Sequence, residues 1–205
     1  NVTDVANPYY RLGMVIKSLD PDGKRGVFES IKKAALTSYY TPLPIAGTMN
    51  EYLSLAGYKG GGSMLDPSIG NGVFEGTMPK DMQQRTQIYG VELDWLTAQI
   101  AKNLYPDAHI QQSGYQEAEL CKDAFDVVES NIPFGSIKVY DPTWRHDSSP
   151  AKKAAQGKIH TYFALKMMEN AKPGGLVTIM TSNSIMDTPG NGIIRDALLE
   201  QGEFL

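Results

Sequence analysis

Cysteine is scarce in this sequence and long apolar runs are missing, and each absence excludes a class of protein. A single cysteine, Cys121, stands among 205 residues, which excludes an intramolecular disulfide scaffold and a four-cysteine zinc site. No run of eighteen apolar residues occurs, so a membrane-spanning helix is not expected. The chain opens without the basic-then-apolar pattern of a secretory leader, and we expect a cytoplasmic protein.

Histidine is also scarce. The three histidines, His109, His146 and His160, lack the spacing of metal ligands, so no metal is expected. His160 stands at a predicted helix start, where a polar surface or capping role is expected. Cys121 lacks the preceding proline that is typical of a cytosine-C5 nucleophile, and we expect a small buried or boundary side chain.

Charge is distributed unevenly along the chain. The net charge is −4, yet residues 11–33 hold six basic and three acidic side chains, and residues 136–160 hold five basic and two acidic ones. Two basic islands on an acidic body can steer a polyanion to one face. Solvated surface loops are the plainer interpretation of either island.

Predicted strands and helices alternate along the chain, and 41% of the residues are apolar, enough for a buried core. Strands are expected at residues 63–66, 88–93, 108–112, 125–129 and 176–181. Helices are expected at 27–36, before Gly57, and at 73–78, 95–104, 159–171 and 193–201. This order predicts an α/β fold with a mostly parallel sheet and helices on both faces.

The expected organisation is an N-terminal helical extension over residues 1–38 and one α/β domain over residues 39–205. The polar loop at 135–157 is too long for a mere connector, and we expect it to be mobile without nucleic acid. The last residues, 203–205, are typical of the start of a strand, which indicates a fragment that lacks its last strands.

A glycine-rich turn follows the first predicted strand, with the sequence Asp66-Pro67-Ser68-Ile69-Gly70-Asn71-Gly72. Glycines there allow the backbone to approach a ligand closely. Glu92, followed by Leu93, comes 22 residues after Gly70 at the end of the next strand. An acid at this place can accept both hydroxyls of an adenosine ribose. The pair favours an adenosine cofactor over an ordinary strand-to-helix turn.

The charge of this turn indicates which cofactor it binds. A dinucleotide site requires a third glycine where Glu75 stands, and a carboxylate in the first helical turn would oppose a pyrophosphate. The lysine of a Walker motif is missing as well. S-adenosylmethionine carries no phosphate and has cationic sulfonium and ammonium groups, which suit Asp66.

A second motif, Ser130-Asn131-Ile132-Pro133-Phe134-Gly135, stands at the end of the strand predicted at 125–129. From about residue 39 to residue 202 the chain resembles the adenine-specific DNA methyltransferases, known from restriction-modification, whose motif here is Asn-Pro-Pro-Tyr or Asn-Pro-Pro-Phe. The resemblance implies a Rossmann-like class I fold, S-adenosylmethionine as the cofactor and the N6 amino group of adenine as the target. The implied catalytic residues are Asn131, Ile132, Pro133 and Phe134.

The resemblance also implies a set of cofactor-binding residues. Tyr40-Thr41-Pro42 resembles the upstream motif that closes over the methionine moiety, and Tyr115 is expected near the cofactor adenine because Gly114 replaces the usual acid. The full implied set is Tyr40, Thr41, Asp66, Pro67, Gly70, Gly72, Glu92, Leu93 and Tyr115.

Elementary chemistry explains the catalytic motif. The adenine amino nitrogen is a poor nucleophile because its lone pair is delocalised into the ring. The side-chain oxygen of Asn131 and a main-chain carbonyl can hold both amino hydrogens, so that the lone pair points at the sulfonium methyl. Phe134 offers a ring on which an extruded base can stack. Ile132 replaces the family's first proline, which keeps the carbonyl and removes one rigid ring.

DNA is therefore the expected partner. The motif is also similar to methylase domains embedded in large mobile-element or phage polypeptides with helicase regions, so further domains for target recognition are expected. Two alternatives stay open: a protein-glutamine or RNA-base amino methyltransferase, and a non-catalytic module that binds cofactor or DNA.

Overall fold

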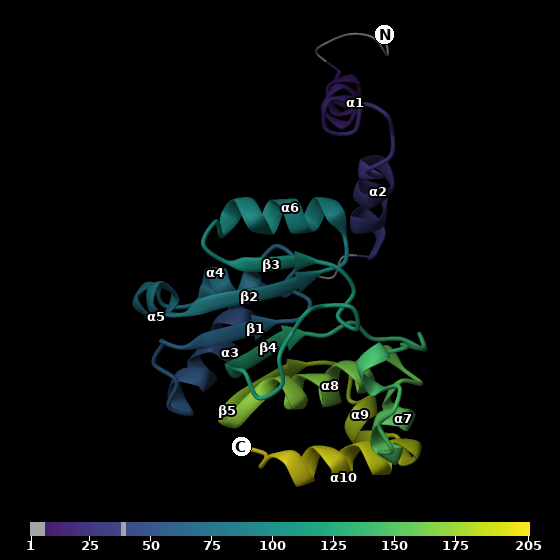
Figure 1. Ribbon diagram of the computed structural model, residues 1–205. Helices are drawn as coiled ribbons and strands as arrows, with labels where there is room; N and C mark the ends of the chain where they lie inside the picture. Colours follow the sequence, from purple (N-terminus) through teal and green to yellow (C-terminus); the bar gives the residue numbers. More distant parts are fainter. Residues whose placement is uncertain (1–6, 38–39) are drawn as a thin grey trace.

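A five-stranded parallel sheet forms the centre of the computed structural model, which describes residues 7–37 and 40–205 (Figure 1). The strand order is β3-β2-β1-β4-β5. The strands are β1 (Ser63–Asp66), β2 (Gln87–Glu92), β3 (His109–Gln112), β4 (Phe125–Asn131) and β5 (Ala171–Met180). The α/β fold with a parallel sheet is the one predicted from the alternation of elements.

Helices precede the sheet and connect its strands. They are α1 (Pro8–Leu19), α2 (Val27–Thr37), α3 (Leu43–Leu55), α4 (Val73–Thr77), α5 (Lys80–Arg85), α6 (Trp95–Leu104), α7 (Pro150–Ala155), α8 (Ile159–Asn170), α9 (Ser184–Asp187) and α10 (Gly192–Gln201), with 3₁₀ turns η1 (Pro142–Trp144) and η2 (Pro189–Asn191). No helix in the described part of the chain has the length and apolar character needed to cross a membrane.

Neighbouring residues of β1 point to opposite faces of the sheet and so build two layers of core. Met64 is fully buried and packs with residues of α3, α4 and α5. Leu65 is fully buried in the larger cluster, which includes residues of α7, α8 and α10. Ile88, paired in register with Met64, packs with Ala101 of α6. Helices α3–α6 therefore cover one face and α7, α8 and α10 the other.

The N-terminal extension projects from the α6 end of the sheet (Figure 1). Asp20 accepts hydrogen bonds from the backbone N–H groups of Arg25 and Val27, which shapes the turn into α2. Ser30 of α2 donates to Asp94, the N-cap of α6. The extension as a separate unit stays a prediction, and the expected boundary at residue 38 and the side chain of Tyr39 lie outside the described residues.

Several boundaries differ from the sequence-based expectation. β4 runs on to Asn131 and β5 starts at Ala171, so that Pro173-Gly174-Gly175 lies within the strand, next to a register shift against residues 125–127. Helix α5 was not predicted because it is short and polar. The expected strand at 203–205 is not formed in the described structure. These residues have no regular structure and do not pair with the sheet.

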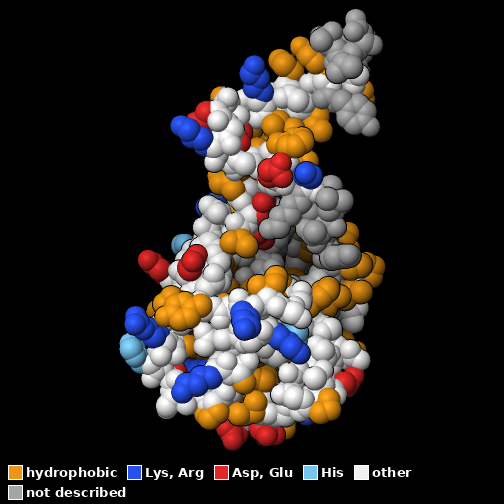
Figure 2. Space-filling model, turned by 90° about the vertical axis from the view of Figure 1, so that its right-hand side faces the viewer, with side chains coloured by type: hydrophobic (Ala, Val, Ile, Leu, Met, Phe, Trp, Pro, Cys, Tyr) orange, Lys and Arg blue, Asp and Glu red, His pale blue; other side chains and the backbone are white. Residues whose placement is uncertain are grey.

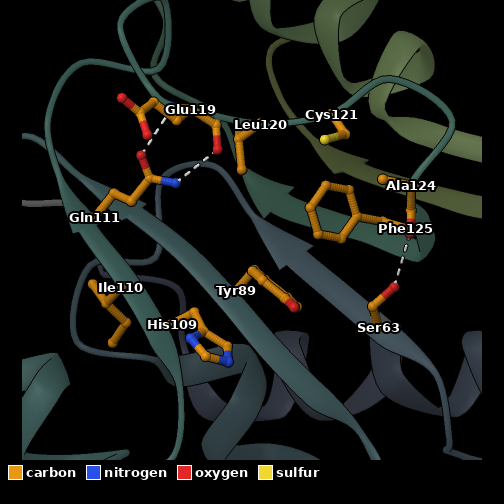
Figure 3. Close-up of a pocket in the computed structure, with 10 residues that line it drawn as sticks. All are labelled: Ser63, Tyr89, His109, Ile110, Gln111, Glu119, Leu120, Cys121, Ala124 and Phe125. Atoms are coloured by element: carbon orange, nitrogen blue, oxygen red, sulfur yellow. Dashed lines mark hydrogen bonds between the residues drawn. The ribbon is translucent and has the colours of Figure 1, made fainter.

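The connection from β3 to β4, residues 113–124, contains no helix in the described structure. Part of the sheet face is consequently open, and a hollow of about 530 Å³ lies there (Figure 3). Tyr89 forms its floor, with the His109 ring stacked at a centroid distance of 4.9 Å and the Phe125 ring edge-on at 5.2 Å. Ser63, His109 and Phe125 begin or nearly begin their strands, so the hollow lies toward the amino ends of the sheet.

Candidate active site at the carboxyl edge of the sheet

Three polar side chains from separate parts of the chain end up at one edge of the sheet. Asp66 ends β1, Glu92 ends β2 and Asn131 ends β4, and these strands are neighbours in the order β2-β1-β4. The chain leaves β1 toward β2 on one side and leaves β4 toward β5 on the other. Ligands of open α/β sheets bind where the connections diverge in this way.

Asp66 anchors the glycine-rich turn to β4. Its side chain is 1% exposed, and its Oδ1 accepts hydrogen bonds from the Ser130 hydroxyl at 2.7 Å and the Ser68 backbone N–H at 2.9 Å. Its Oδ2 is buried and has no partner. Burial raises the pKa of Asp66 to about 7. One carboxylate oxygen is thus left for a ligand that would enter beside the turn.

The turn holds two backbone conformations that favour glycine. Gly70 has φ +56° and Gly72 has φ +77°. The Tyr105 hydroxyl donates to the Gly72 carbonyl at 2.5 Å, and a Cβ on Gly72 would lie 2.1 Å from a ring carbon of Tyr105. Any side chain at Gly72 would therefore displace this ring and distort the turn.

Glu92 joins the end of β2 to the same turn. Its Oε2 accepts from the Gly70 backbone N–H at 3.1 Å, and its Oε1 accepts from the Asp94 N–H at 2.7 Å. Burial raises the pKa of Glu92 above its ordinary value. Leu93 is 63% exposed next to it, and Pro67 is buried within the turn. Glu92 thus both supports the turn and lies at its rim.

The predicted lid and the predicted catalytic motif are in direct contact. The Asn131 side-chain NH₂ donates to the Thr41 hydroxyl at 3.1 Å, although the two residues are 90 positions apart. Within the described residues, the Asn131 side chain forms no other hydrogen bond, so its Oδ1 remains an acceptor. Tyr40 is half exposed, and its ring would lie 3.9 Å from a Cβ placed on Gly70.

The rest of the catalytic motif divides into a buried and an exposed half. Ile132 is 1% exposed and its N–H donates to the Met180 carbonyl of β5 at 3.0 Å, which fixes the start of the turn. Pro133 is half-buried. Phe134 is 55% exposed at the surface, and its stacking role toward a base stays a prediction.

Tyr115, which was expected near the cofactor adenine, is buried in the core. It is 3% exposed within the larger core cluster, and its hydroxyl donates to Asn170 at 2.6 Å. Its ring packs against Tyr162 and Phe163 of α8. These contacts give Tyr115 a structural role in the core, and its contact with the cofactor adenine stays a prediction.

Two expectations about residues outside the predicted site are wrong. His160 is 5% exposed instead of lying on the surface, and its Nε2 lies 3.2 Å from the Ser184 hydroxyl, just after β5. Burial lowers the pKa of His160. The apolar residues that follow it in α8 were the signal for a buried helix start. Cys121 is exposed rather than buried and lines the hollow at the amino ends of the strands (Figure 3).

The segment between β4 and α8 is packed, contrary to the expected mobile loop. It forms η1 and α7, and Trp144 is 2% exposed with its indole N–H donating to Glu169 at 2.9 Å. Asp141 is fully buried, with Lys166 at 3.0 Å and the Tyr162 hydroxyl at 2.8 Å. Polar residues thus anchor the segment through partners that are distant in the sequence. Phe134, Ile137 and Tyr140 remain exposed at its start.

Cations gather around this packed segment. The segment's two acids, Asp141 and Asp147, are engaged by Lys166 and Lys152. Within the described residues the remaining cations form no ion pair; these are Lys138, Arg145, Lys153 and Lys158. Figure 2, which views the side on which α7 lies in Figure 1, shows lysine and arginine side chains spread over the lower half of this face.

The chain is similar to known proteins in sequence and in fold. A family described as N-6 DNA Methylase matches residues 26–204. The chain is 32% identical over 173 residues, or 83% of its length, to Defense against restriction protein B of Escherichia phage P1, and it spans 7% of that protein. Its fold is similar to the type I restriction-modification system methyltransferase subunit of Streptococcus thermophilus, with a TM-score of 0.64 and 20% identity, covering 78% of this chain and 38% of that one.

Proposed function

This chain belongs to the N-6 DNA methylase family, and we propose that its carboxyl-edge site binds S-adenosylmethionine and transfers a methyl group to the N6 amino group of adenine in DNA. The observation that carries this proposal is the Asn131–Thr41 hydrogen bond, because it joins the catalytic motif to the segment expected to cover the cofactor. The hydrogen bonds and the exposure of the other site residues support the roles that we assign to them.

The glycine-rich turn fits the proposed cofactor. Gly70 leaves open space on the turn beside the Tyr40 ring, Gly72 makes room for the Tyr105 ring that supports the turn, and the unpartnered Oδ2 of Asp66 offers an acceptor to a cationic group. Glu92 has further lone pairs for ribose hydroxyls. Bound there, S-adenosylmethionine supplies an electrophilic methyl group on its sulfonium. Thr41 and Tyr40 lie where they would cover the methionine end.

Asn131 performs the central task toward adenine. The Thr41 hydroxyl accepts a hydrogen bond from the Asn131 side-chain NH₂, which orients the Asn131 Oδ1 as the acceptor for one amino hydrogen of adenine. We assign the other amino hydrogen to the main-chain carbonyl of Ile132. Both acceptors favour a pyramidal nitrogen whose lone pair faces the methyl group. The methylated nitrogen is an acidic ammonium, so its proton leaves readily to water. Phe134 provides the ring for stacking the extruded base.

Recognition of a DNA sequence is proposed to come from other parts of the protein. The phage P1 relative is far longer than this chain, and the packed segment between β4 and α8 offers exposed cations and rings for contacts to DNA. We therefore assign this domain the chemistry and non-specific contacts to DNA.

Substitution of Asn131 tests the proposal. We expect Asn131→Ala to lower the rate of methyl transfer on the order of a hundredfold or more, since the acceptor acts where charge develops. Affinity for S-adenosylhomocysteine, measured by calorimetry, should stay nearly unchanged. Nucleoside analysis of unmethylated and premethylated duplexes identifies the methylated atom. Full activity in Asn131→Ala, or methylation of protein or RNA alone, would contradict the proposed reaction.

Thr41 offers a matched pair of variants. Thr41→Ser keeps the hydroxyl that accepts from Asn131, whereas Thr41→Val keeps the shape and removes it. We expect the valine variant to transfer methyl groups at least about tenfold more slowly than the serine variant, because one misdirected hydrogen bond costs about 1.4 kcal/mol or more. Equal rates would show that Thr41 does not orient Asn131.

A further inference from the structure

Three carboxyl groups are buried together beneath the glycine-rich turn. Asp66 of β1 is 1% exposed, and Glu75 of α4 and Glu129 of β4 are 0% exposed. None of them takes part in an ion pair within the described residues. Four of their six oxygens have no hydrogen-bond partner among the residues that the structure describes: one of Asp66, both of Glu75 and one of Glu129.

The fold brings these carboxyl groups close to one another. Leu65 is paired in register with Val128, and the next step along the parallel strands places Asp66 beside Glu129. Helix α4 starts directly after Gly72 and carries Glu75 in its first turn. Burial, and the neighbouring charges of Asp66 and Glu129, raise the pKa of Glu75 well above its ordinary value.

Helix α3 adds a further acceptor beside this cluster. Asn50 is 1% exposed, and its side-chain NH₂ donates to the Phe74 carbonyl at 2.9 Å and the Thr77 hydroxyl at 3.0 Å, both of α4. Its Oδ1 is buried without a partner. The donors that reach the three carboxyl groups are few and neutral: the Ser130 hydroxyl, the Ser68 N–H and the Thr178 hydroxyl. The cluster is therefore rich in unused acceptors.

Such a cluster cannot hold three negative charges in the free domain. An uncompensated buried carboxylate is so costly that the group keeps its proton instead. The other titratable groups acting on the cluster do not relieve this, because Glu92 faces Asp66 as a second acid, and Tyr105 and Tyr115, which also interact with its acids, are neutral. Since no cation among the described residues neutralises the cluster, bound protons must do so.

We propose that the buried carboxyl cluster of Asp66, Glu75 and Glu129 is the charge complement of the cofactor: it is protonated in the free domain and releases protons to solvent when the cationic cofactor occupies the turn. This inference rests on the proposed cofactor site. Its first consequence is that binding of S-adenosylmethionine tightens as the pH rises. Its second is a preference for S-adenosylmethionine over S-adenosylhomocysteine, because the product has lost the sulfonium charge near the cluster.

Calorimetry with both ligands tests the proposal. Binding enthalpies measured in two buffers of different ionisation enthalpy give the number of protons released. One linked proton tightens binding by up to about tenfold per pH unit, and we expect a slope of this kind between about pH 6 and pH 8. S-adenosylhomocysteine should release fewer protons than S-adenosylmethionine in the same buffers.

Amide variants identify the groups that release the protons. Glu75→Gln and Glu129→Gln keep the shape of each side chain and remove its proton exchange, so we expect fewer protons released and a pH slope at least about threefold shallower per unit. Glu117→Gln changes an exposed acid outside the cluster and serves as the control. Since every variant meets the same ligand, the ligand's own titration cancels. Slopes equal to that of Glu117→Gln would overturn the proposal.

A measurement without ligand guards against variants that fold poorly. Infrared spectra of the unsubstituted chain at neutral pH should show a band of protonated carboxyl groups, which weakens when S-adenosylmethionine is added. Absence of the band overturns the proposal. Cofactor binding with no proton release overturns the inference while leaving the proposed function intact. If the band is present but S-adenosylmethionine does not bind at any pH, the proposed cofactor site is wrong, and the proposed function and this inference are both overturned.

Discussion

Single side chains assemble the site through contacts that join distant parts of the sequence. Asn131 bonds to Thr41 across 90 positions, and Asp66 bonds to Ser130 across 64. Each contact brings together two segments to which we assign different tasks, one toward the cofactor and one toward the base. The strand ends provide the rigidity, because Asp66 and Asn131 both terminate buried parallel strands.

Glu92 makes the clearest prediction for a single side chain. We expect Glu92→Ala to weaken S-adenosylhomocysteine binding by about 1–3 kcal/mol, the cost of losing hydrogen bonds to a charged acceptor. Because Glu92 also accepts from the Gly70 N–H, part of this loss reflects a looser turn. Isothermal calorimetry measures the affinity, and Glu117→Ala, an exposed acid, is the control. An unchanged affinity would remove Glu92 from the cofactor site.

The segment between β4 and α8 shows how polar residues order a chain that looks mobile in sequence. Glu169 of α8 is its main anchor and contacts Lys152 at 2.6 Å and the Trp144 indole N–H at 2.9 Å. Salt bridges from Lys122 and Lys152 and the Trp144 N–H hold the pKa of this carboxyl at about 2, against the effect of burial. These contacts attach the segment to α8 and order the chain that follows the Asn131–Phe134 motif.

Removal of the Trp144 ring should loosen the segment between β4 and α8. We expect Trp144→Ala to lower the free energy of unfolding by about 3–5 kcal/mol, because removing a 2%-exposed ring leaves a cavity and takes one hydrogen-bond donor from the Glu169 carboxylate. Trp144→Phe keeps the ring and loses only the N–H, so its cost should be smaller. Hydrogen exchange over residues 136–157 should rise in the alanine variant. Unaltered exchange would show that other contacts hold the segment.

The buried acids set how stability of the whole molecule depends on pH. Burial raises the pKa of Glu129 to about 8 and that of Asp66 to about 7. At a pH below the ordinary pKa of a carboxyl group, both groups are protonated in the folded and unfolded states. Their ionisation then takes nothing from the free energy of unfolding. As the pH rises, the unfolded chain ionises first, so the folded state loses stability until its own groups ionise near pH 7–8.

Urea unfolding across this range measures the effect. We expect the free energy of unfolding to fall by about 2 kcal/mol or more between mildly acidic and mildly alkaline pH. Glu129→Gln should flatten the curve, whereas Glu117→Gln should leave it unchanged. Acids with lowered pKa values, such as Glu169, act only at lower pH and do not mask the trend. A stability that rises across the range would contradict the assignment of buried protonated acids.

The cations of the segment between β4 and α8 should make the affinity for DNA depend on the salt concentration. Lys138 and Lys153 are exposed cations of the β4–α8 segment. If each neutralises one phosphate, Lys138→Ala and Lys153→Ala should each reduce the slope of log affinity against log salt by about 1. Lys80→Ala, an exposed lysine of α5 at the opposite side of the sheet in Figure 1, is the control. Equal slopes in all variants would place the DNA elsewhere.

Local chemistry along the chain was sufficient to predict the parallel α/β fold and the two motifs. Strand 63–66 and helix 95–104 form as expected, because apolar patterning, the Asp94 cap and the closing proline act over a few residues. The glycine turn and the Asn131 motif were likewise visible in order, and their tasks in binding and catalysis remain predictions.

Long-range packing determined the features that the sequence did not reveal. Whether Tyr115 faces a ligand or the core, whether residues 136–157 move, and whether Glu75 and Glu129 reach water all depend on partners such as Asn170, Glu169 and Asn50. No local propensity encodes these encounters, since a polar side chain is exposed or buried according to what the folded chain places around it.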